Sequence, residues 1–351
     1  MHAIVHIGSP KAGSTALQVA LYQNRAALAQ MSVLLCSGGP RNIANAYTDP
    51  TRKLVPHERS DFTSIKEAIA TSRKTLDDFI ATVQIRKPEV ALFSSEHLLR
   101  IKDKAAFIDF LKAHFERITL VAYIRDPQSF YPSAIDQQIR GGYKLRQLPL
   151  PTTFGYNFHE HLQEYRALVG AQSMVVRNFE RNNLTGGDIL VDFKQILQDL
   201  TGRDAPLDAP GFTRNQSLPA IASLWLLSVN EEFNLRDPET DVALVARRFE
   251  TIRAIRDNPA LQHLPRLRLT HPPLMQALRQ ATHAACKELN EVFFEGQQKF
   301  PLGDGGTPPP NPALRAELKT WLMSYAEDAQ ALRSFLAAHM PERRPSEPPG
   351  S

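Results

Sequence analysis

The chain has 351 residues, of which 42% are hydrophobic and 22% charged, with a formal net charge of +4 and an isoelectric point near 9.0. This is the composition of an ordinary globular protein, and its weak positive charge argues against a nucleic-acid binder while suiting an anionic ligand. The two cysteines lie far apart, which excludes a disulfide framework, and no cluster has the spacing of a Cys/His metal site. No window approaches 18 consecutive apolar residues, which excludes a membrane span.

The N-terminal segment combines an apolar strand over 3–7, a glycine-rich turn and a helix over 14–30. Backbone N–H groups of such a turn and the positive end of the helix dipole point at one anion. Gly8 and Gly13 have the spacing of the nucleoside-triphosphate loop Gly-x-x-x-x-Gly-Lys-[Ser/Thr], but Ser14 stands where that motif requires lysine. We therefore expect the turn to hold a phosphate without the Mg-triphosphate chemistry of that motif.

The chain then alternates between strands and helices. The further strands are expected at 32–35, 89–94, 118–125 and 173–177. The further helices are expected at 63–85, 103–115, 128–140, 158–169 and 187–200. This alternation predicts an α/β fold, a parallel sheet flanked by helices. The segment 118–125 is almost continuously apolar, as a strand buried on both faces requires, and 37–62 is interpreted as a long excursion of the chain.

The C-terminal part is mainly helical in its pattern. We expect a main domain over 1–302 with a mainly helical extension at 218–302, a linker at 303–312, a C-terminal helix at 313–340 and a disordered tail at 341–351. One helix of the extension carries several arginines, interpreted as a solvated face rather than a surface for an anionic glycan or lipid head group: Arg247, Arg248, Arg253 and Arg256. The N-terminus shows no signal-peptide pattern, which favours a cytoplasmic protein.

The run Pro10-Lys11-Ala12-Gly13-Ser14-Thr15 resembles the Pro-Lys-Ser/Ala-Gly-[Ser/Thr]-[Ser/Thr] loop of the sulfotransferases. In that family the loop binds the 5′-phosphosulfate end of 3′-phosphoadenosine 5′-phosphosulfate (PAPS). The resemblance implies a P-loop-like sulfotransferase fold in which Lys11, Ala12, Gly13, Ser14 and Thr15 contact the donor. Ala12 replaces the commoner serine, so one hydroxyl near the phosphate is lost.

The strand 118–125 ends in a second segment of interest. Arg125 is followed by Asp126-Pro127 and, eight residues after the arginine, by Ser133, which resembles the 3′-phosphate segment of the sulfotransferases. Ligands of α/β sheets lie at the carboxyl ends of strands, and the planar guanidinium of Arg125 can bind a phosphate through two hydrogen bonds. Taken alone, the segment fits equally well a helix start with a local ion pair.

The likeness becomes weaker further along the chain. It continues through 175–180 and through the segment Asn215-Gln216-Ser217-Leu218, which is similar to one of bacterial members. The Arg-Lys-Gly segment of the cytosolic enzymes is absent, which disfavours an aryl or steroid sulfotransferase of that type. Without this segment, the sequence does not indicate which residues would cover the 3′-phosphate.

A catalytic base is expected directly after the strand 89–94, where Ser95 is followed by Glu96 and His97. Sulfuryl transfer needs an acceptor hydroxyl to lose its proton, which a carboxylate or histidine can accept. Carbohydrate sulfotransferases resembling the heparan sulfate enzymes place a catalytic glutamate at this topological position, which makes Glu96 the leading candidate. His97 is the alternative, because the cytosolic branch uses a histidine. Glu96 could instead act only as a charge in the first turn of a helix over 97–101.

The resemblance therefore implies an enzyme that moves a sulfuryl group from PAPS to a hydroxyl and releases PAP. The expected acceptor is a carbohydrate or glycan, or another small hydroxyl compound, in a bacterial carbohydrate-type branch. No metal and no nucleic acid are expected, and peripheral membrane association is left open. Two alternatives remain: a P-loop kinase, disfavoured because no lysine follows Gly13, and a non-catalytic nucleotide-binding protein, disfavoured by Lys11 and Glu96.

Overall fold

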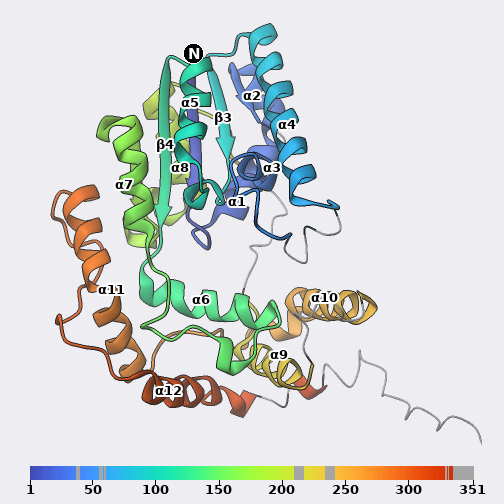
Figure 1. The fold of residues 1–351 in the computed structure, drawn as a ribbon, viewed down its shortest axis with the longest axis vertical. Coiled ribbons are helices and arrows are strands. Elements are labelled where there is room, and N and C mark those ends of the chain that lie inside the picture. Colours follow the sequence, from blue (N-terminus) through green and yellow to red (C-terminus); the bar gives the residue numbers. More distant parts are fainter. Residues whose placement is uncertain are drawn as a thin grey trace, which may run out of the picture. The chain divides into compact units, whose positions relative to one another are not determined.

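The computed structural model describes residues 1–36, 40–54, 58, 61–208, 217–233, 242–328, 330 and 332–334 (Figure 1). The chain divides into two compact units. Unit 1 contains Met1–Asp126, Gly155–Asn215 and Thr282–Leu302. Unit 2 contains Pro127–Phe154, Gln216–Ala281 and Gly303–Ser351.

Unit 1 is built on a five-stranded parallel sheet with the strand order β2-β3-β1-β4-β5. The strands are β1 (His2–Gly8), β2 (Val33–Leu35), β3 (Val90–Ser94), β4 (Arg117–Ile124) and β5 (Met174–Asn178). The predicted α/β class is confirmed. The central strand β1 is buried over its whole length, and β4 is buried from Thr119 onward, as its apolar sequence predicts.

Helices cover both faces of this sheet. They are α1 (Ser14–Gln23), α2 (Arg25–Gln30), α3 (Pro40–Asn45), α4 (Ile65–Arg86), α5 (Lys104–His114), α7 (Phe158–Val169) and α8 (Ile189–Thr201). Successive residues of a strand point to opposite faces. Leu92 of β3 belongs to the core that includes Leu17 of α1 and Phe193 of α8. The next residue, Phe93, packs edge to face on Phe79 of α4, with ring centroids 5.1 Å apart.

The single helix expected over 14–30 is wrong, because the structure has two helices, α1 and α2, with a break at Asn24. The side-chain amide of Asn24 donates to the carbonyl oxygens of Ala20 and Asp208. A short amide side chain that binds the backbone in this way competes with continuation of the helix. Other helix starts follow the sequence closely: the side chains of Ser64 and Asp103 accept N–H groups of the first turns of α4 and α5.

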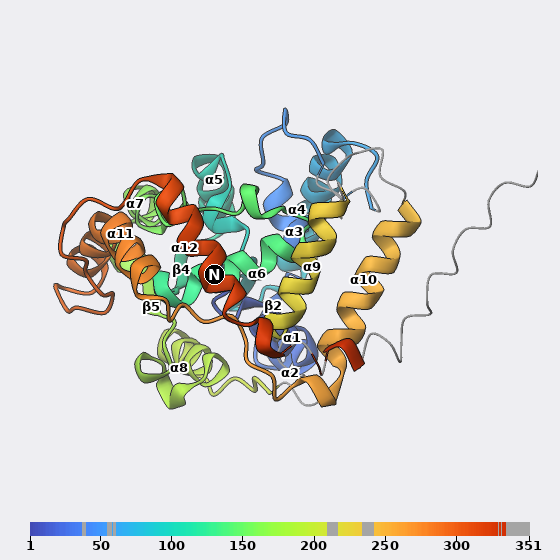
Figure 2. The same cartoon turned by 90° about the horizontal axis from the view of Figure 1, so that it is seen from below.

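Unit 2 is helical. It contains α6 (Pro127–Arg140), α9 (Ala220–Glu232), α10 (Val242–Asp257) and α12 (Asn311–Met323), and the first part of α11 (Pro272–Phe293). Figure 2 shows α9 beside α12. Their shared core contains Trp321, which is 1% exposed and stacks on Tyr131 of α6 with ring centroids 6.2 Å apart.

Two expectations for the C-terminal part are modified. The helix expected over 313–340 is interrupted, because α12 ends at Met323 and the Ser324 hydroxyl donates to the carbonyl oxygen of Trp321. The expected linker 303–312 is irregular up to the start of α12 and mostly exposed, but its first residue is closely packed, since a Cβ on Gly303 would lie 2.6 Å from the carbonyl oxygen of Arg279. The tail 341–351, the pair Asn215-Gln216 and parts of the excursion 37–62 lie outside the described residues.

The arginine-bearing helix is α10, and one of its arginines has a structural role. Arg248 donates to the carbonyl oxygens of Ile139 and Arg140 at the end of α6, where a cation complements the helix dipole.

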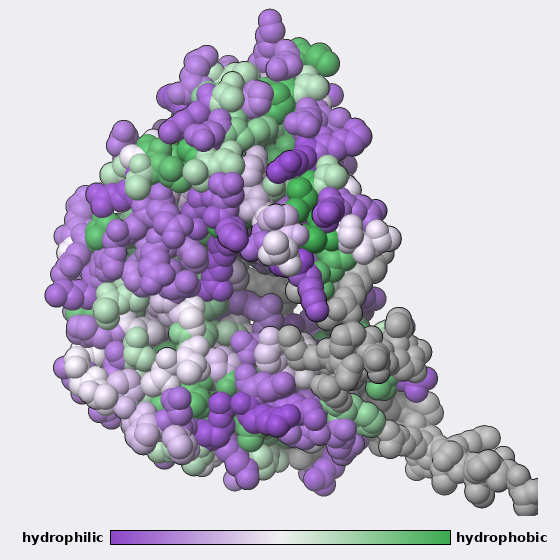
Figure 3. Space-filling view, viewed as in Figure 1, coloured by the Kyte–Doolittle hydropathy of each residue, from purple (hydrophilic) through white to green (hydrophobic). Residues whose placement is uncertain are grey.

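Hydrophilic and hydrophobic residues are intermixed on the face of the molecule that Figure 3 shows. Among the described helices, none combines the length and apolarity needed to cross a bilayer.

Candidate functional site

The glycine-rich turn adopts a conformation that requires its glycines. Gly13 has φ +76°, and a Cβ at this position would lie 2.9 Å from side-chain atoms of both Ile189 and Phe179. Gly8 has φ +116°, and a Cβ at this position would lie equally close to the backbone oxygen of Glu96. Lys11 also has a positive φ, 64°. The turn is therefore tightly wound between β1 and α1, and larger side chains at its glycines would displace it.

The turn presents the N-terminus of α1 without a side-chain cap. The N-cap residue Gly13 makes no side-chain hydrogen bond to the helix, and the first N–H groups of any α-helix lack an intrahelical acceptor. Ser14 is buried, and its hydroxyl donates to the carbonyl oxygen of Ser9 at 3.1 Å, so this side chain braces the turn. Thr15 is exposed. An uncapped helix N-terminus of this kind is the type of position at which proteins bind anions.

Arg125 lies against the turn. Its Nη1 donates to the carbonyl oxygen of Lys11 over 3.1 Å, so residues 114 positions apart in the sequence are joined. The hydroxyl of Tyr156 in turn donates to the carbonyl oxygen of Arg125 at 2.8 Å. Burial lowers the pKa of Arg125, while the nearby carboxylates of Glu180 and Asp126 raise it. The guanidinium therefore stays charged beside the turn.

The strand order explains why these two segments meet. After β1 the chain leaves toward β2 at one edge of the sheet, whereas after β4 it leaves toward β5 at the other edge. The connections that follow the neighbouring strands β1 and β4 therefore run in opposite directions. Such a point is the topological switch point where open α/β sheets bind ligands. The glycine-rich turn follows β1 and Arg125 follows β4. The sequence supplied both segments, but only the strand order makes them neighbours.

Glu96 also lies at this edge of the sheet. A Cβ on Gly8 would be 2.9 Å from the backbone oxygen of Glu96, so the segment after β3 is packed directly on the start of the turn. The N–H of Ser95 donates to the carbonyl oxygen of His6 at 2.9 Å and fixes this segment. Glu96 is half-buried and His97 is exposed. The expected helix over 97–101 is only a 3-10 turn, Leu98–Arg100, which offers little helix dipole for Glu96 to complement.

Ser133 lies in α6 and is half-buried. It belongs to unit 2, whereas Arg125 belongs to unit 1. Its expected contact with the same phosphate as Arg125 stays a prediction. Among the residues that the structure describes, no group of three or more His, Cys, Asp or Glu side chains could hold a metal ion.

A buried network that sequence reasoning missed supports β4, the strand that Arg125 follows. Asp192 of α8 is 1% exposed, and its carboxylate accepts the hydroxyl of Tyr123 at 2.8 Å and the N–H and hydroxyl of Thr185, each at 2.9 Å. The carboxylate raises the pKa of Tyr123 further than burial alone does. The network fixes α8 to the end of β4. Its only signal in the sequence is an aspartate at an apolar position of an amphipathic helix.

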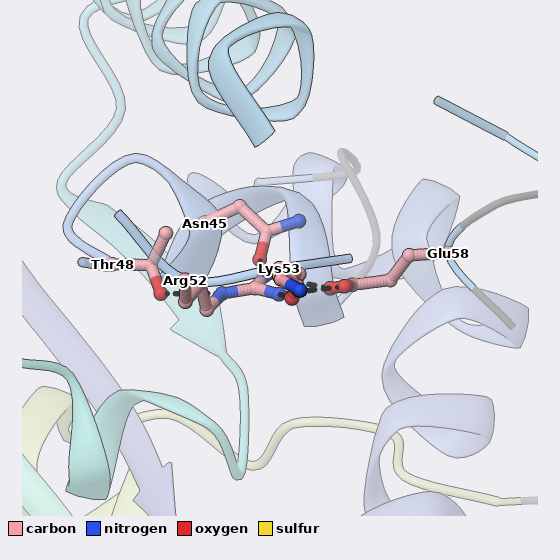
Figure 4. Close-up of polar contacts among 5 residues, drawn as sticks. All are labelled: Asn45, Thr48, Arg52, Lys53 and Glu58. Carbon is pink, nitrogen blue, oxygen red and sulfur yellow. Dashed lines mark hydrogen bonds and ion pairs between the residues drawn. The ribbon is translucent and has the colours of Figure 1, made fainter. Parts of the chain in front are cut away.

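The excursion after β2 is organised by one arginine (Figure 4). All five N–H donors of Arg52 have acceptors: Thr48, Asn45, the carbonyl oxygen of Lys53, and both carboxylate oxygens of Glu58 at 2.7 and 2.8 Å. Glu58 is 5% exposed, and a planar two-bond pair of this kind is geometrically specific. The described part of the excursion is therefore a folded loop.

That loop is fixed beside the segment that follows Glu96. Lys102 binds the carboxylate of Asp49 at 2.6 Å, and the N–H of Asp103 donates to the carbonyl oxygen of Tyr47. The ring of Tyr47 packs on Phe107 of α5 with centroids 5.1 Å apart. The described part of the excursion thus lies beside the first turn of α5 and the residues just before it.

His6 lies in β1 immediately before the turn and is fully buried. Its Nδ1 is 2.8 Å from the hydroxyl of Ser94 on β3, and burial lowers its pKa from 6.5 to about 3. Between these two pH values the unfolded chain binds a proton that the folded chain does not. The contribution of His6 to stability is therefore complete above pH 6.5 and declines as the pH falls toward 3.

This predicts a pH-dependent difference between the wild type and His6→Asn, whose amide retains a polar group near Nδ1. The free energy of unfolding of the wild type should fall by about 2 kcal/mol more than that of the variant between pH 7 and pH 5. Urea titrations of both proteins at the two pH values measure this difference. An equal fall in both proteins would show that His6 does not titrate on unfolding.

Comparisons of the chain with protein-family models, with curated proteins and with solved structures gave no match. The site is therefore defined by its own geometry. The glycine-rich turn, Arg125 and Glu96 meet at the carboxyl edge of the sheet.

Proposed function

We propose that the protein is a PAPS-dependent sulfotransferase that acts on a hydroxyl of a carbohydrate. The observation that carries the proposal is the hydrogen bond from Arg125 to the carbonyl oxygen of Lys11. It joins the turn expected at the 5′-phosphosulfate to the arginine expected at the 3′-phosphate. A ligand with anionic groups at both positions would satisfy both segments.

The residues present fit such a ligand. Gly13 lets the turn pack closely on Phe179 and Ile189, and the helix N-terminus that follows it has no side-chain cap. Lys11 and Arg125 supply two positive charges, and N–H groups at the start of α1 add donors. When bound, PAPS supplies an activated sulfuryl group on a phosphate leaving group.

Each residue then has a separate task. Glu96 accepts the proton of the acceptor hydroxyl, whose oxygen forms the new bond to sulfur. Lys11 neutralises the negative charge that develops on the leaving phosphate oxygen as its bond to sulfur breaks. Arg125 positions the nucleotide through its phosphate. We expect the excursion that contains Arg52 to contribute to the acceptor site.

A kinase of the nucleoside-triphosphate class fits the turn less well. Its motif needs a lysine directly after the second glycine, where this chain has Ser14. The Ser14 hydroxyl is also engaged within the turn, since it donates to the carbonyl oxygen of Ser9.

Transfer itself can be measured directly. Incubation of the protein with PAPS carrying labelled sulfate and a cell-envelope glycan fraction of the source organism should move label into the glycan and release equimolar PAP. Release of PAP without label in the glycan would indicate hydrolysis only. Phosphate transfer from ATP to the same fraction, with no sulfate transfer, would support the kinase alternative and contradict the proposal.

A further inference from the structure

A cavity of about 590 Å³ opens within unit 2, away from the residues discussed so far. Its walls come from α9, from the end of α12 and the turn after it, and from the short turn Leu145–Gln147. The wall residues are mostly apolar and include Leu224 and Trp225 of α9, Met323 of α12, and Leu332. The volume lies within the range of small-molecule sites.

In the part of the chain that the structure describes, the apolar walls stay partly open to water. Met323 is 53% exposed and Trp225 is only half-buried, although both side chains belong to residues that usually lie inside. An apolar surface left open to water gains free energy when a hydrocarbon chain covers it, by about 0.8 kcal/mol for each buried methylene. The cavity therefore favours a ligand with an aliphatic chain.

The polar residues of the cavity indicate the charge of that ligand. Arg146 and Arg333 are both exposed lining residues, and within the described part of the chain no ion pair joins either of them to a carboxylate. The acidic lining residue, Glu231, is already engaged, because its carboxylate accepts the N–H of Leu145 at 2.6 Å. Two arginines beside an apolar cavity complement a chain with an anionic head.

We propose that unit 2 binds a free, single-chain amphiphile with an anionic head group. The hydrocarbon chain occupies the cavity against Trp225, and the head group lies beside Arg146 and Arg333. The inference is independent of the proposed transferase activity, because none of these residues belongs to the site at the sheet.

Calorimetry with monomeric octanoate and decanoate, each below its micellar concentration, tests whether the cavity binds a hydrocarbon chain. Affinity should rise about 15-fold over the two added methylenes, and the emission of Trp225 should shift to the blue. Decanoate should bind more tightly than decanol, by about fivefold. Equal affinity for both carboxylates, no detectable binding, or binding only to vesicles that contain anionic phospholipid would overturn the proposal.

Two sets of variants distinguish binding of the hydrocarbon chain from binding of the head group. Arg146→Gln with Arg333→Gln should remove the preference for decanoate over decanol, whereas Arg247→Gln with Arg253→Gln on exposed positions of α10 should keep it. Ser228→Phe places a ring in the cavity from an exposed position and should abolish binding of both compounds while the thermal midpoint stays unchanged. Full binding by Ser228→Phe would show that the compounds bind elsewhere.

Discussion

Replacing Lys11 by alanine is expected to lower turnover by roughly 10²-fold or more, because the variant lacks the cation beside the leaving oxygen. The substitution keeps the backbone carbonyl that receives Arg125. The turn should therefore keep its shape, and the thermal midpoint should hardly change. The measurement is the initial rate of label transfer from PAPS at saturating donor.

Lys66→Ala is the matched control, because Lys66 is an exposed lysine of α4. This control should turn over at the wild-type rate. If Lys11→Ala also kept the wild-type rate, Lys11 would have no part in the transfer step. A loss confined to donor affinity would assign Lys11 to binding alone.

The second large effect is expected for Glu96→Gln, which keeps the shape of the side chain and removes its basic group. Turnover should fall by roughly 10²- to 10⁴-fold if Glu96 accepts the acceptor proton. Binding of PAP and the thermal midpoint should stay close to wild type. Initial rates, calorimetry and a melting curve on the same preparation give all three quantities.

Glu116→Gln serves as the control, since the side chain of Glu116 is 88% exposed. A purely structural Glu96 would give the opposite pattern, a lower thermal midpoint with turnover retained. If Glu96→Gln keeps its activity and His97→Ala loses it, the base is His97.

The sequence predicted the elements of unit 1 well because their signals are local. Ser64 and Asp103 mark helix starts, and the apolar run of β4 marks a strand buried on both faces. The break at Asn24 was missed because it depends partly on the distant carbonyl oxygen of Asp208. Local patterns contain no information about such partners.

The candidate site was predictable in part for the same reason. The turn with Gly8 and Gly13 is a local motif, and the positive φ angles at these two positions are ones that glycine adopts readily. The contact of Arg125 with Lys11 depends on strand order, which spacing alone does not determine. The roles of His6 and Asp192 depend on burial within a sheet and a helix whose packing partners are remote in sequence.

The most direct test of the account is calorimetric binding of PAP and of Mg-ATP to the wild type and to Arg125→Ala. The wild type should bind PAP more tightly than Mg-ATP, and added Mg²⁺ should not change the PAP affinity. Arg125→Ala should weaken PAP binding by roughly 2–4 kcal/mol, because the variant loses a partly desolvated charge pair, and should affect adenosine 5′-phosphate, which lacks the 3′-phosphate, far less. Tighter binding of Mg-ATP than of PAP by the wild type would contradict the assignment of this site to a sulfuryl donor.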